Sequence, residues 1–274
     1  MDNTSTLKNI QKIELEIAAH IFDLCRKHKL TCVLAGGSCL GAIRHKGMIP
    51  WDDDIDLAMP RNDYERFIEL CEKELSSKYF FQHLDSEENC AYIFGKVRKN
   101  NTKLTEEYSH NIKMHQGIWV DIFPYDNISD SHLRRKFNNM WISFYKNLLI
   151  VKVGFGIPRN SSFLFSVAYY ISKIISLFFS KKFLKKKLRK HMLKYNNQKT
   201  EKIRPYAGAY GEAENMSNDL FENPIEVDFN GYKFLTFKDY DMYLTKLYGD
   251  YMTPPPPEKR NGGNHHIKEV ICGE

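Results

Sequence analysis

The sequence predicts a mixed α/β domain in which a sheet with flanking helices carries a helical insertion. Three observations predict it: an amphipathic pattern at the start, short apolar segments separated by turn residues up to about residue 126, and a helical, lysine-rich region after that point. The 274 residues suffice for one large domain, and 14% aromatic content argues against disorder. The net charge of +6 is compatible with an anionic substrate, a membrane surface or nucleic acid, and selects none of them.

The first segments are predicted to be a helix, a buried strand and a glycine turn. Apolar residues recur every three or four positions over residues 5–29, which is typical of an amphipathic helix. A short apolar run over 31–35 fits a buried strand. The sequence Gly36-Gly37-Ser38 interrupts this strand, and we expect Ser38 to cap a short helix that extends through Arg44.

A second strand and helix are predicted next. Apolar and polar residues alternate over 55–59, which predicts a strand that ends at Pro60. We expect Asn62 or Asp63 to cap a helix that extends to about Leu75.

Four more strands are predicted before residue 126. Asn100 and Asn101, between the second and third of these strands, fit a hairpin turn. In the fourth strand the alternation places Trp119, Asp121 and Phe123 on one side. The predicted strands cover residues 79–84, 91–98, 102–106 and 117–125.

The character of the sequence changes after residue 126. Residues 130–198 are predicted to be helical; within them 162–180 is strongly apolar, and 181–194 contains eight Lys or Arg. Further on, Asn230-Gly231 indicates a hairpin, and a helix is expected to begin near Asp239 and to end near Tyr248. These changes predict a core range over 1–126, a helical, basic region over 127–200 and a C-terminal segment over 201–274 that completes the domain.

The six cysteines are predicted to be free thiols, most of them with a buried structural role. None belongs to a C-x-x-C pair, so the sequence does not indicate a zinc knuckle. No secretory signal opens the chain, and together with the cysteine pattern this favours the reducing cytoplasm. The cysteines are Cys25, Cys32, Cys39, Cys71, Cys90 and Cys272.

Four aspartates within five residues form the most informative motif. Because residues two apart in a strand point to the same face, Asp54 and Asp56 are predicted to project together while their neighbours face the core. Two close carboxylates repel each other, and an oxygen-liganded cation such as Mg²⁺ or Mn²⁺ relieves this repulsion. Asp52 and Asp53 are interpreted instead as residues of a solvated turn.

Asp121 and the 36–38 turn extend this motif. Asp121 is a lone acid inside an apolar strand, and beside Asp54 and Asp56 it is better interpreted as a third ligand or a general base than as a structural acid. Glycines allow close approach of the backbone, and N–H groups at a helix start attract phosphate. The sequence therefore predicts a site that holds a metal ion and a phosphate.

These residues resemble the nucleotidyltransferase-fold superfamily, and a longer string is more specific. Residues 36–45 and 49–56 are similar to the LicD family of phosphocholine transferases, whose relatives include the fukutin-type proteins. The similarity continues through 95–102 and 117–124 and resumes near 248–252. It covers the first half of the chain well and the end moderately, whereas the helical region is not diagnostic.

The resemblance implies a nucleotidyltransferase-like mixed sheet, a catalytic core over 1–126 and a metal-dependent transferase. Its donor would be CDP-choline, and phosphocholine would pass to a sugar hydroxyl of a teichoic acid, lipopolysaccharide or capsule precursor, with release of CMP. Asp54, Asp56 and Asp121 would be the catalytic residues and the ligands of Mg²⁺ or Mn²⁺. Gly37, Ser38, Arg44, His45, Lys96 and Arg98 would bind the donor.

Other interpretations stay open for the basic residues of this set. Lys96 and Arg98 also fit the alternating polar face of a strand. Arg44 and His45 also fit a helix C-terminus, where cations are favoured by the helix dipole.

Two segments outside the motif have open roles. The apolar stretch and the lysines of 162–194 suggest peripheral contact with the inner face of a membrane, which a lipid-linked acceptor would make useful. Lys173 and five serines argue against a transmembrane span, and a core helix followed by a solvated charged helix is the alternative. His265 and His266 either contact the substrate or belong to a mobile tail.

Two other functions also fit the sequence. A nucleotidyltransferase would transfer a nucleoside monophosphate and release pyrophosphate instead of CMP. A non-catalytic protein would bind polyanions or membranes through the basic helix, and Asp54→Asn and Asp56→Asn would leave its activity in cells unchanged. No recognised nucleic-acid module is present, so no nucleic-acid partner is expected.

Overall fold

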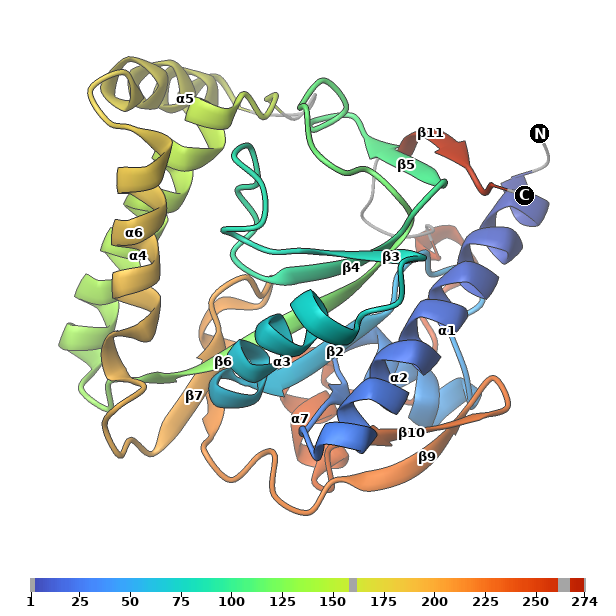
Figure 1. The fold of residues 1–274 in the computed structure, drawn as a ribbon. Coiled ribbons are helices and arrows are strands. Elements are labelled where there is room, and N and C mark those ends of the chain that lie inside the picture. Colours follow the sequence, from blue (N-terminus) through green and yellow to red (C-terminus); the bar gives the residue numbers. More distant parts are fainter. Residues whose placement is uncertain (1–2, 158–161, 261–266, 274) are drawn as a thin grey trace.

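Nine strands form a mixed sheet at the centre of the structure, a computed structural model that describes residues 3–157, 162–260 and 267–273 (Figure 1). The strands are β1 (Val33–Leu34), β2 (Asp56–Pro60), β3 (Tyr79–Gln82), β4 (Gly95–Lys99), β6 (Trp119–Ile128), β7 (Lys202–Pro205), β8 (Met216–Ser217), β9 (Ile225–Phe229) and β10 (Tyr232–Thr236). Their order is β3-β4-β6-β2-β1-β10-β9, and β7 pairs with β6 and β8 off this path. Only β2–β6 and β1–β10 are parallel among the described pairs of this sheet, which confirms the predicted mixed α/β class.

Four helices cover the two faces of this sheet. They are α1 (Asn3–His28), α2 (Gly36–His45), α3 (Arg61–Glu74) and α7 (Tyr240–Tyr248). One hydrophobic core joins α1 and α3 to one face, and a second joins α2 and α7 to the other (Figure 1). Because side chains alternate along a strand, Leu57 and Met59 of β2 enter the first core and Ala58 enters the second. Asp56, in phase with Ala58, therefore lies on the side of α2 and α7.

The predicted helical region forms a separate layer beside the sheet. Its helices are α4 (His132–Val153), α5 (Phe163–Ser176) and α6 (Lys181–Met192), followed by η1 (Leu193–Tyr195). In Figure 1, α4 and α6 stand side by side and α5 lies across their end. Leu148, Leu149, Leu184 and Leu188 form a third core with residues from the 84–112 segment. No single helix in the described ranges is long and apolar enough to cross a membrane. The helix α5 and the segment Lys181–Tyr195 together have the length and composition of a membrane span, but they are bent by 112° relative to each other.

The predicted hairpin around Asn100 and Asn101 is wrong. The chain does turn here, because Asn101 has a φ of 61°. However, β5 (Lys103–Glu106) does not return along β4 and pairs instead with β11 (Ile267–Ile271) in a second, two-stranded sheet. The turn is a local property, whereas the partner of β5 comes from the other end of the chain.

The predicted helix caps are also wrong, although the helices exist. α2 begins at Gly36 with Ala35 as its N-cap, so Ser38 lies inside the first turn. α3 begins directly after Pro60, which places Asn62 and Asp63 inside the helix. The Asp63 carboxylate accepts a hydrogen bond from the Thr31 N–H at 2.8 Å and so fastens α3 to the segment before β1.

The C-terminal segment shares the main sheet with the N-terminal one. The predicted hairpin at Asn230-Gly231 is confirmed by the antiparallel pairing of β9 and β10, and α7 begins after its N-cap Asp239. β10 pairs with β1, and β7 pairs with β6. The division into 1–126, 127–200 and 201–274 stays a prediction.

The six cysteines all lie in the described ranges and are free; five are buried. Two further short helices are η2 (Gly211–Glu214) and η3 (Pro257–Lys259).

Candidate active site

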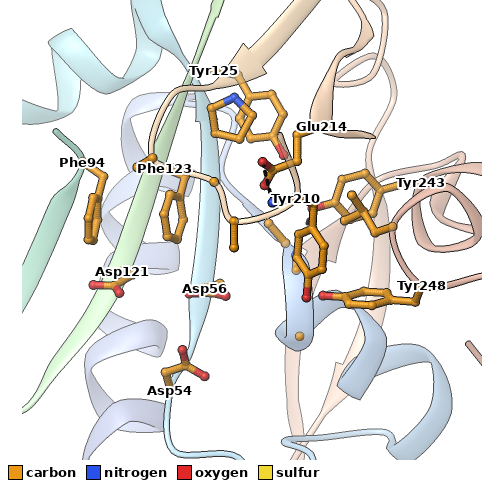
Figure 2. A pocket seen from close by; sticks show the side chains of 18 of the residues that line it. Asp54, Asp56, Phe94, Asp121, Phe123, Tyr125, Tyr210, Glu214, Tyr243 and Tyr248 are labelled. Carbon is orange, nitrogen blue, oxygen red and sulfur yellow. Dashed lines mark hydrogen bonds between the residues drawn. The ribbon is translucent and has the colours of Figure 1, made fainter. Parts of the chain in front are cut away.

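A pocket of about 380 Å³ opens on the α2 and α7 side of the sheet, near the starts of β2 and β6 (Figure 2). One wall is acidic, one is the glycine turn at the start of α2, and one is aromatic. Five carboxylates line it, from Asp52, Asp54, Asp56, Asp121 and Glu214. Such a combination of acids, backbone N–H groups and rings in one concave site is typical of a binding or catalytic pocket.

The sheet brings the three predicted aspartates to the same wall. Asp56 and Asp121 are direct partners in the parallel pairing of β2 with β6. Asp54 stands two residues before Asp56 and also lines the pocket, and Figure 2 shows it below the other two. Ile55 and Leu57 are fully buried in the opposite core, so the predicted alternation of this segment is confirmed.

Lys96 holds the carboxylate of Asp121. Its Nζ donates to Oδ1 at 2.7 Å and to Oδ2 at 3.0 Å, and both side chains are buried. The ammonium group also lies 4.1 Å from the ring centroid of Trp119 and 4.9 Å from that of Phe94, within cation–π distance. Lys96 is therefore a buried residue of β4 whose direct partner is Asp121.

Arg98 is also buried, but its hydrogen bonds go away from the pocket. Its Nε donates to Gln82 Oε1 and its Nη1 to the Gly117 carbonyl, each at 2.7 Å. Its guanidinium carbon lies 4.8 Å from the ring centroid of Trp119, the first residue of β6. Arg98 therefore fixes β3, β4 and the start of β6 relative to one another.

Arg44 and His45 occupy the last turn of α2, the position that the helix-dipole interpretation describes. The Arg44 Nη1 donates to the Tyr251 carbonyl at 2.6 Å, and its Nε donates to His45 Nε2 at 3.0 Å. The His45 ring meets the edge of Trp51, a pocket residue, at 5.8 Å between centroids. The pair therefore lies behind the pocket wall.

The acidic wall is more crowded than the sequence indicated. Carboxylate oxygens of Asp52, Asp53 and Asp54 lie within 4.8 Å of one another, and Asp53 is buried. Burial, then the charges of Asp54 and Asp53, raises the pKa of Asp52 to about 8. Burial contradicts the interpretation of Asp53 as a solvated turn residue, whereas Asp52 is half-buried and closes a turn by donating its N–H to the Ile49 carbonyl at 2.9 Å. Such repulsion between hard oxygen ligands is what a divalent cation relieves, so these residues fit a metal site.

Glu14 of α1 is a buried acid that the sequence analysis missed. Within the described residues its Oε2 has no hydrogen-bond partner. Burial, followed by the charges of Asp54, Asp53 and Asp121, raises the pKa of Glu14 well above its ordinary value. The sequence does contain a signal for the burial of Glu14, because this residue follows Ile10 by four positions and so lies on the apolar face of the helix.

The glycine turn is pressed against the carboxylates. Gly36 has a φ of +51°, and a Cβ on it would lie 3.0 Å from Asp56 Oδ2; a Cβ on Gly37 would lie 3.0 Å from Asp52 Oδ2. The Ser38 hydroxyl accepts a hydrogen bond from the Asp56 N–H at 2.9 Å. The turn thus fixes the start of β2, and Gly36 and Gly37 line the pocket at the N-terminus of α2.

An aromatic wall faces the acids, and the sequence analysis did not find it. The Tyr210 and Tyr248 rings meet edge to face at 5.3 Å, and their hydroxyls are hydrogen bonded to each other beside Asp56 (Figure 2). Phe94 and Phe123 stack at 4.9 Å near the other end of the wall. The strand alternation had placed Phe123 beside Asp121, whereas Phe94, Tyr210 and Tyr248 come from other segments and no local pattern indicated them.

Two contacts connect the aromatic wall to the rest of the site. The Gly36 N–H donates to the Tyr243 hydroxyl at 3.0 Å, which fastens the glycine turn to α7. The Tyr210 N–H donates to a carboxylate oxygen of Glu214 at 3.1 Å, and burial raises the pKa of Glu214. The carboxylate of Glu214 therefore stabilises the loop that carries Tyr210.

The structure brings part of the predicted site together. Gly37, Asp54, Asp56 and Asp121 line the pocket, and Ser38 and Lys96 bond to residues that do. Arg44, His45 and Arg98 lie behind the wall. The roles of all nine residues stay predictions, and His265 and His266 lie outside the described residues.

Comparisons with known proteins identify the family of the chain. The family described as "LicD/FKTN/FKRP, nucleotidyltransferase domain" matches residues 29–151, a range that contains Asp54, Asp56 and Asp121. The lipopolysaccharide cholinephosphotransferase LicD of Haemophilus influenzae is 30% identical over 284 residues, which cover 96% of this chain and 97% of that protein. A similarity of this extent, together with the pocket, identifies this chain as a member of the LicD family.

Proposed function

We propose that this chain transfers phosphocholine from CDP-choline to a sugar hydroxyl of a cell-surface glycan and releases CMP, with Mg²⁺ or Mn²⁺ as its cofactor. The observation that carries the proposal is the pocket, which combines aspartates from two adjacent parallel strands with a glycine turn and an aromatic wall. A relative that matches almost the whole chain is named a lipopolysaccharide cholinephosphotransferase. A lipopolysaccharide precursor is therefore the first acceptor to test.

The acidic wall supports a divalent cation. Asp54, Asp56 and Asp121 would hold it, and Asp54 also belongs to the close group formed with Asp52 and Asp53. These are carboxylate ligands, which suit magnesium and manganese. When bound, the cation would neutralise the phosphates of the donor and the charge that develops on the leaving CMP.

The residues of the chain supply the positioning. Asp121, oriented by the two hydrogen bonds from Lys96, would accept the proton of the acceptor hydroxyl. The acceptor oxygen then forms a bond to the phosphorus of phosphocholine, and the bond between that phosphorus and CMP breaks, so that CMP leaves with the electron pair. The N–H groups of Gly37 and Ser38 would bind the donor phosphates, since the Gly36 N–H is donated to Tyr243 and the glycines let the backbone approach closely.

The aromatic wall supports choline as the transferred head group. A quaternary ammonium group has no N–H to donate, so proteins bind it on aromatic faces. The pocket offers the Tyr210–Tyr248 pair and the Phe94–Phe123 stack, with the carboxylates of Asp56 and Glu214 nearby. This combination of rings and negative charge suits trimethylammonium.

The test incubates the purified protein with Mg²⁺, a choline-free lipopolysaccharide and one of three donors: CDP-choline, CDP-ethanolamine or CTP. We expect CMP from CDP-choline, choline on the glycan and no reaction in EDTA. Asp56→Asn should lower the rate about 100-fold or more, because it removes a group that acts on the reacting phosphates. Asp228→Asn is the matched control, since Asp228 is an exposed acid of β9 paired with Lys233.

Each other outcome has a definite meaning. Pyrophosphate from CTP would assign a nucleotidyltransferase instead. Absence of CMP from every CDP-linked donor, with lipopolysaccharide, teichoic acid and capsule acceptors alike, would reject the proposed function.

A further inference from the structure

The helix α5 is apolar yet almost wholly exposed. Of its 14 residues only Ser176 is buried. Leu164 is 78% exposed and Ile171 is 52% exposed, and the apolar residues continue past the helix end through Phe178, which is 81% exposed. A contiguous apolar surface of this kind marks an interaction site. We call the exposed apolar side chains of 163–178 the α5 surface.

The helical region that carries the α5 surface is strongly cationic. Residues 131–200 contain sixteen of the 40 Lys and Arg residues and none of the 34 Asp and Glu residues. The rest of the chain has 24 basic and 34 acidic residues, which is a net charge of −10. Lys182 and Lys186 of α6 are exposed just after the α5 surface. The apolar surface therefore lies in the only strongly basic part of the sequence.

A cavity of about 350 Å³ lies between the helix α5 and the candidate active site. Phe165 and Tyr169 of α5 line it together with Ile150 of α4, and its wall is mainly apolar. Phe94 and Ala207 line both this cavity and the catalytic pocket. The helix α5 therefore borders a cavity that adjoins the candidate active site.

We propose that the α5 surface binds an anionic lipid bilayer, with α5 lying in the head-group layer, so that the pocket faces a glycan carried on a lipid. A helix of 14 residues is about 21 Å long, shorter than the hydrocarbon core of about 30 Å, so it lies on the membrane and does not cross it. Only the second half of the proposal, the presentation of a glycan, rests on the proposed function.

Charge selects the bilayer over a second copy of the chain. Two copies meeting through α5 would bring two cationic helical regions together, which like-charge repulsion opposes. An anionic bilayer offers both apolar depth for the α5 surface and negative charge for exposed lysines such as Lys173 of α5 and Lys182 at the start of α6. Each of these lysines close to the lipid is expected to tighten binding about fivefold.

The direct test is flotation of the full-length protein with vesicles of phosphatidylcholine containing 30% phosphatidylglycerol. We expect the protein to float with these vesicles, to stay behind with pure phosphatidylcholine, and to bind about tenfold or more weakly as the Leu164→Gln/Ile171→Gln variant. The matched control is Met242→Gln/Ile271→Gln, which changes two exposed apolar residues outside the helical region and should float like wild type.

A second readout separates this proposal from the proposed function. With a soluble, delipidated sugar acceptor the Leu164→Gln/Ile171→Gln variant should release CMP at the wild-type rate, and with a vesicle-embedded acceptor it should be slower. Wild-type protein that stays behind with anionic vesicles, or a variant that floats like wild type, would overturn the membrane proposal. So would dimerisation that the variant abolishes without any vesicle binding. Vesicle binding without CMP release would instead reject the proposed function alone.

Discussion

Replacing Lys96 with methionine tests the buried ion pair that orients Asp121. The Lys96 Nζ lies 2.7 Å from Asp121 Oδ1, and the two side chains are only 2% and 5% exposed. Methionine keeps most of the length and the apolar stem, so contacts with the Trp119 ring are largely retained. The substitution therefore removes a charge and two hydrogen bonds while it changes the packed volume little.

The expected magnitude follows from burial. Removing one partner of a buried ion pair leaves an uncompensated charge and costs about 3–5 kcal/mol. Lys99, on the same strand, provides a matched control, because its Nζ is also 2.7 Å from a carboxylate, that of Glu16, but these side chains are 24% and 45% exposed. Exposed pairs contribute about 0–1 kcal/mol. The two methionine variants should therefore differ by about 2–5 kcal/mol.

Urea unfolding in EDTA, followed by tryptophan fluorescence, measures both free energies of unfolding. The double variant Lys96→Met/Asp121→Asn should recover much of the loss, because it leaves no buried charge without a partner. Lys96→Met should also lower kcat in the CMP assay, since Asp121 loses its orientation. If Lys96→Met and Lys99→Met were equally destabilised, the pair would not hold Asp121 and the reasoning would be refuted.

Three further predictions test other parts of the site. The Gly36→Ala variant must keep a φ of +51° and place a methyl group 3.0 Å from Asp56 Oδ2, so we expect it to lose about 1–2 kcal/mol of unfolding free energy and most of its CMP release. The control is Gly231→Ala, at a φ of +85° in open space, which should keep its activity. Equal activity of the two variants would contradict this prediction. Burial raises the pKa of Glu14 above its unfolded value near 4.5, so the wild-type protein loses stability as the pH rises above 4.5. The Glu14→Gln variant should therefore have a higher Tm than wild type at pH 7.5 in EDTA. The same gain in Tm at pH 4 would show that the charge of Glu14 is not the cause. Tyr210→Leu should raise KM for CDP-choline about fivefold and change KM for CDP-ethanolamine less, whereas equal changes would remove Tyr210 from choline recognition.

Sequence patterns predicted the elements whose signals are local. The apolar spacing of α1 and the alternation around Asp54 and Asp56 both depend on neighbouring residues, and both agree with the structure. The Asn230-Gly231 turn agrees for the same reason, because two residues suffice to set that hairpin.

Two predictions failed because a distant partner competed with a local preference. The turn at Asn101 exists, yet β5 pairs with β11, whose residue Ile271 lies opposite Lys103. Ser38 has the chemistry of a helix cap, but its hydroxyl accepts a hydrogen bond from the Asp56 N–H of the next strand. A local preference was outweighed in both cases by a contact that only the folded chain provides.

The same limit explains the unpredicted half of the site. Asp52 sits in a sequence typical of a turn, and only the folded chain shows the burial that raises its pKa. Tyr210 and Tyr248 come from the C-terminal segment and meet only across the pocket. The acids could be found because three of them follow strand alternation, whereas the rings carry no periodic signal.

The parallel pairing of β1 with β10 determines when this pocket can exist during synthesis. Leu34 faces Thr236 in that pairing, and the Gly36 N–H is held by Tyr243, 207 residues further along the chain. A ribosome therefore releases the glycine turn and the aspartates long before the segment that fixes them. Contacts of such long sequence separation form late in folding. A nascent chain ending before α7 carries every predicted aspartate and still lacks the Tyr243 contact that holds the turn, so the pocket is complete only after nearly the whole chain has been made.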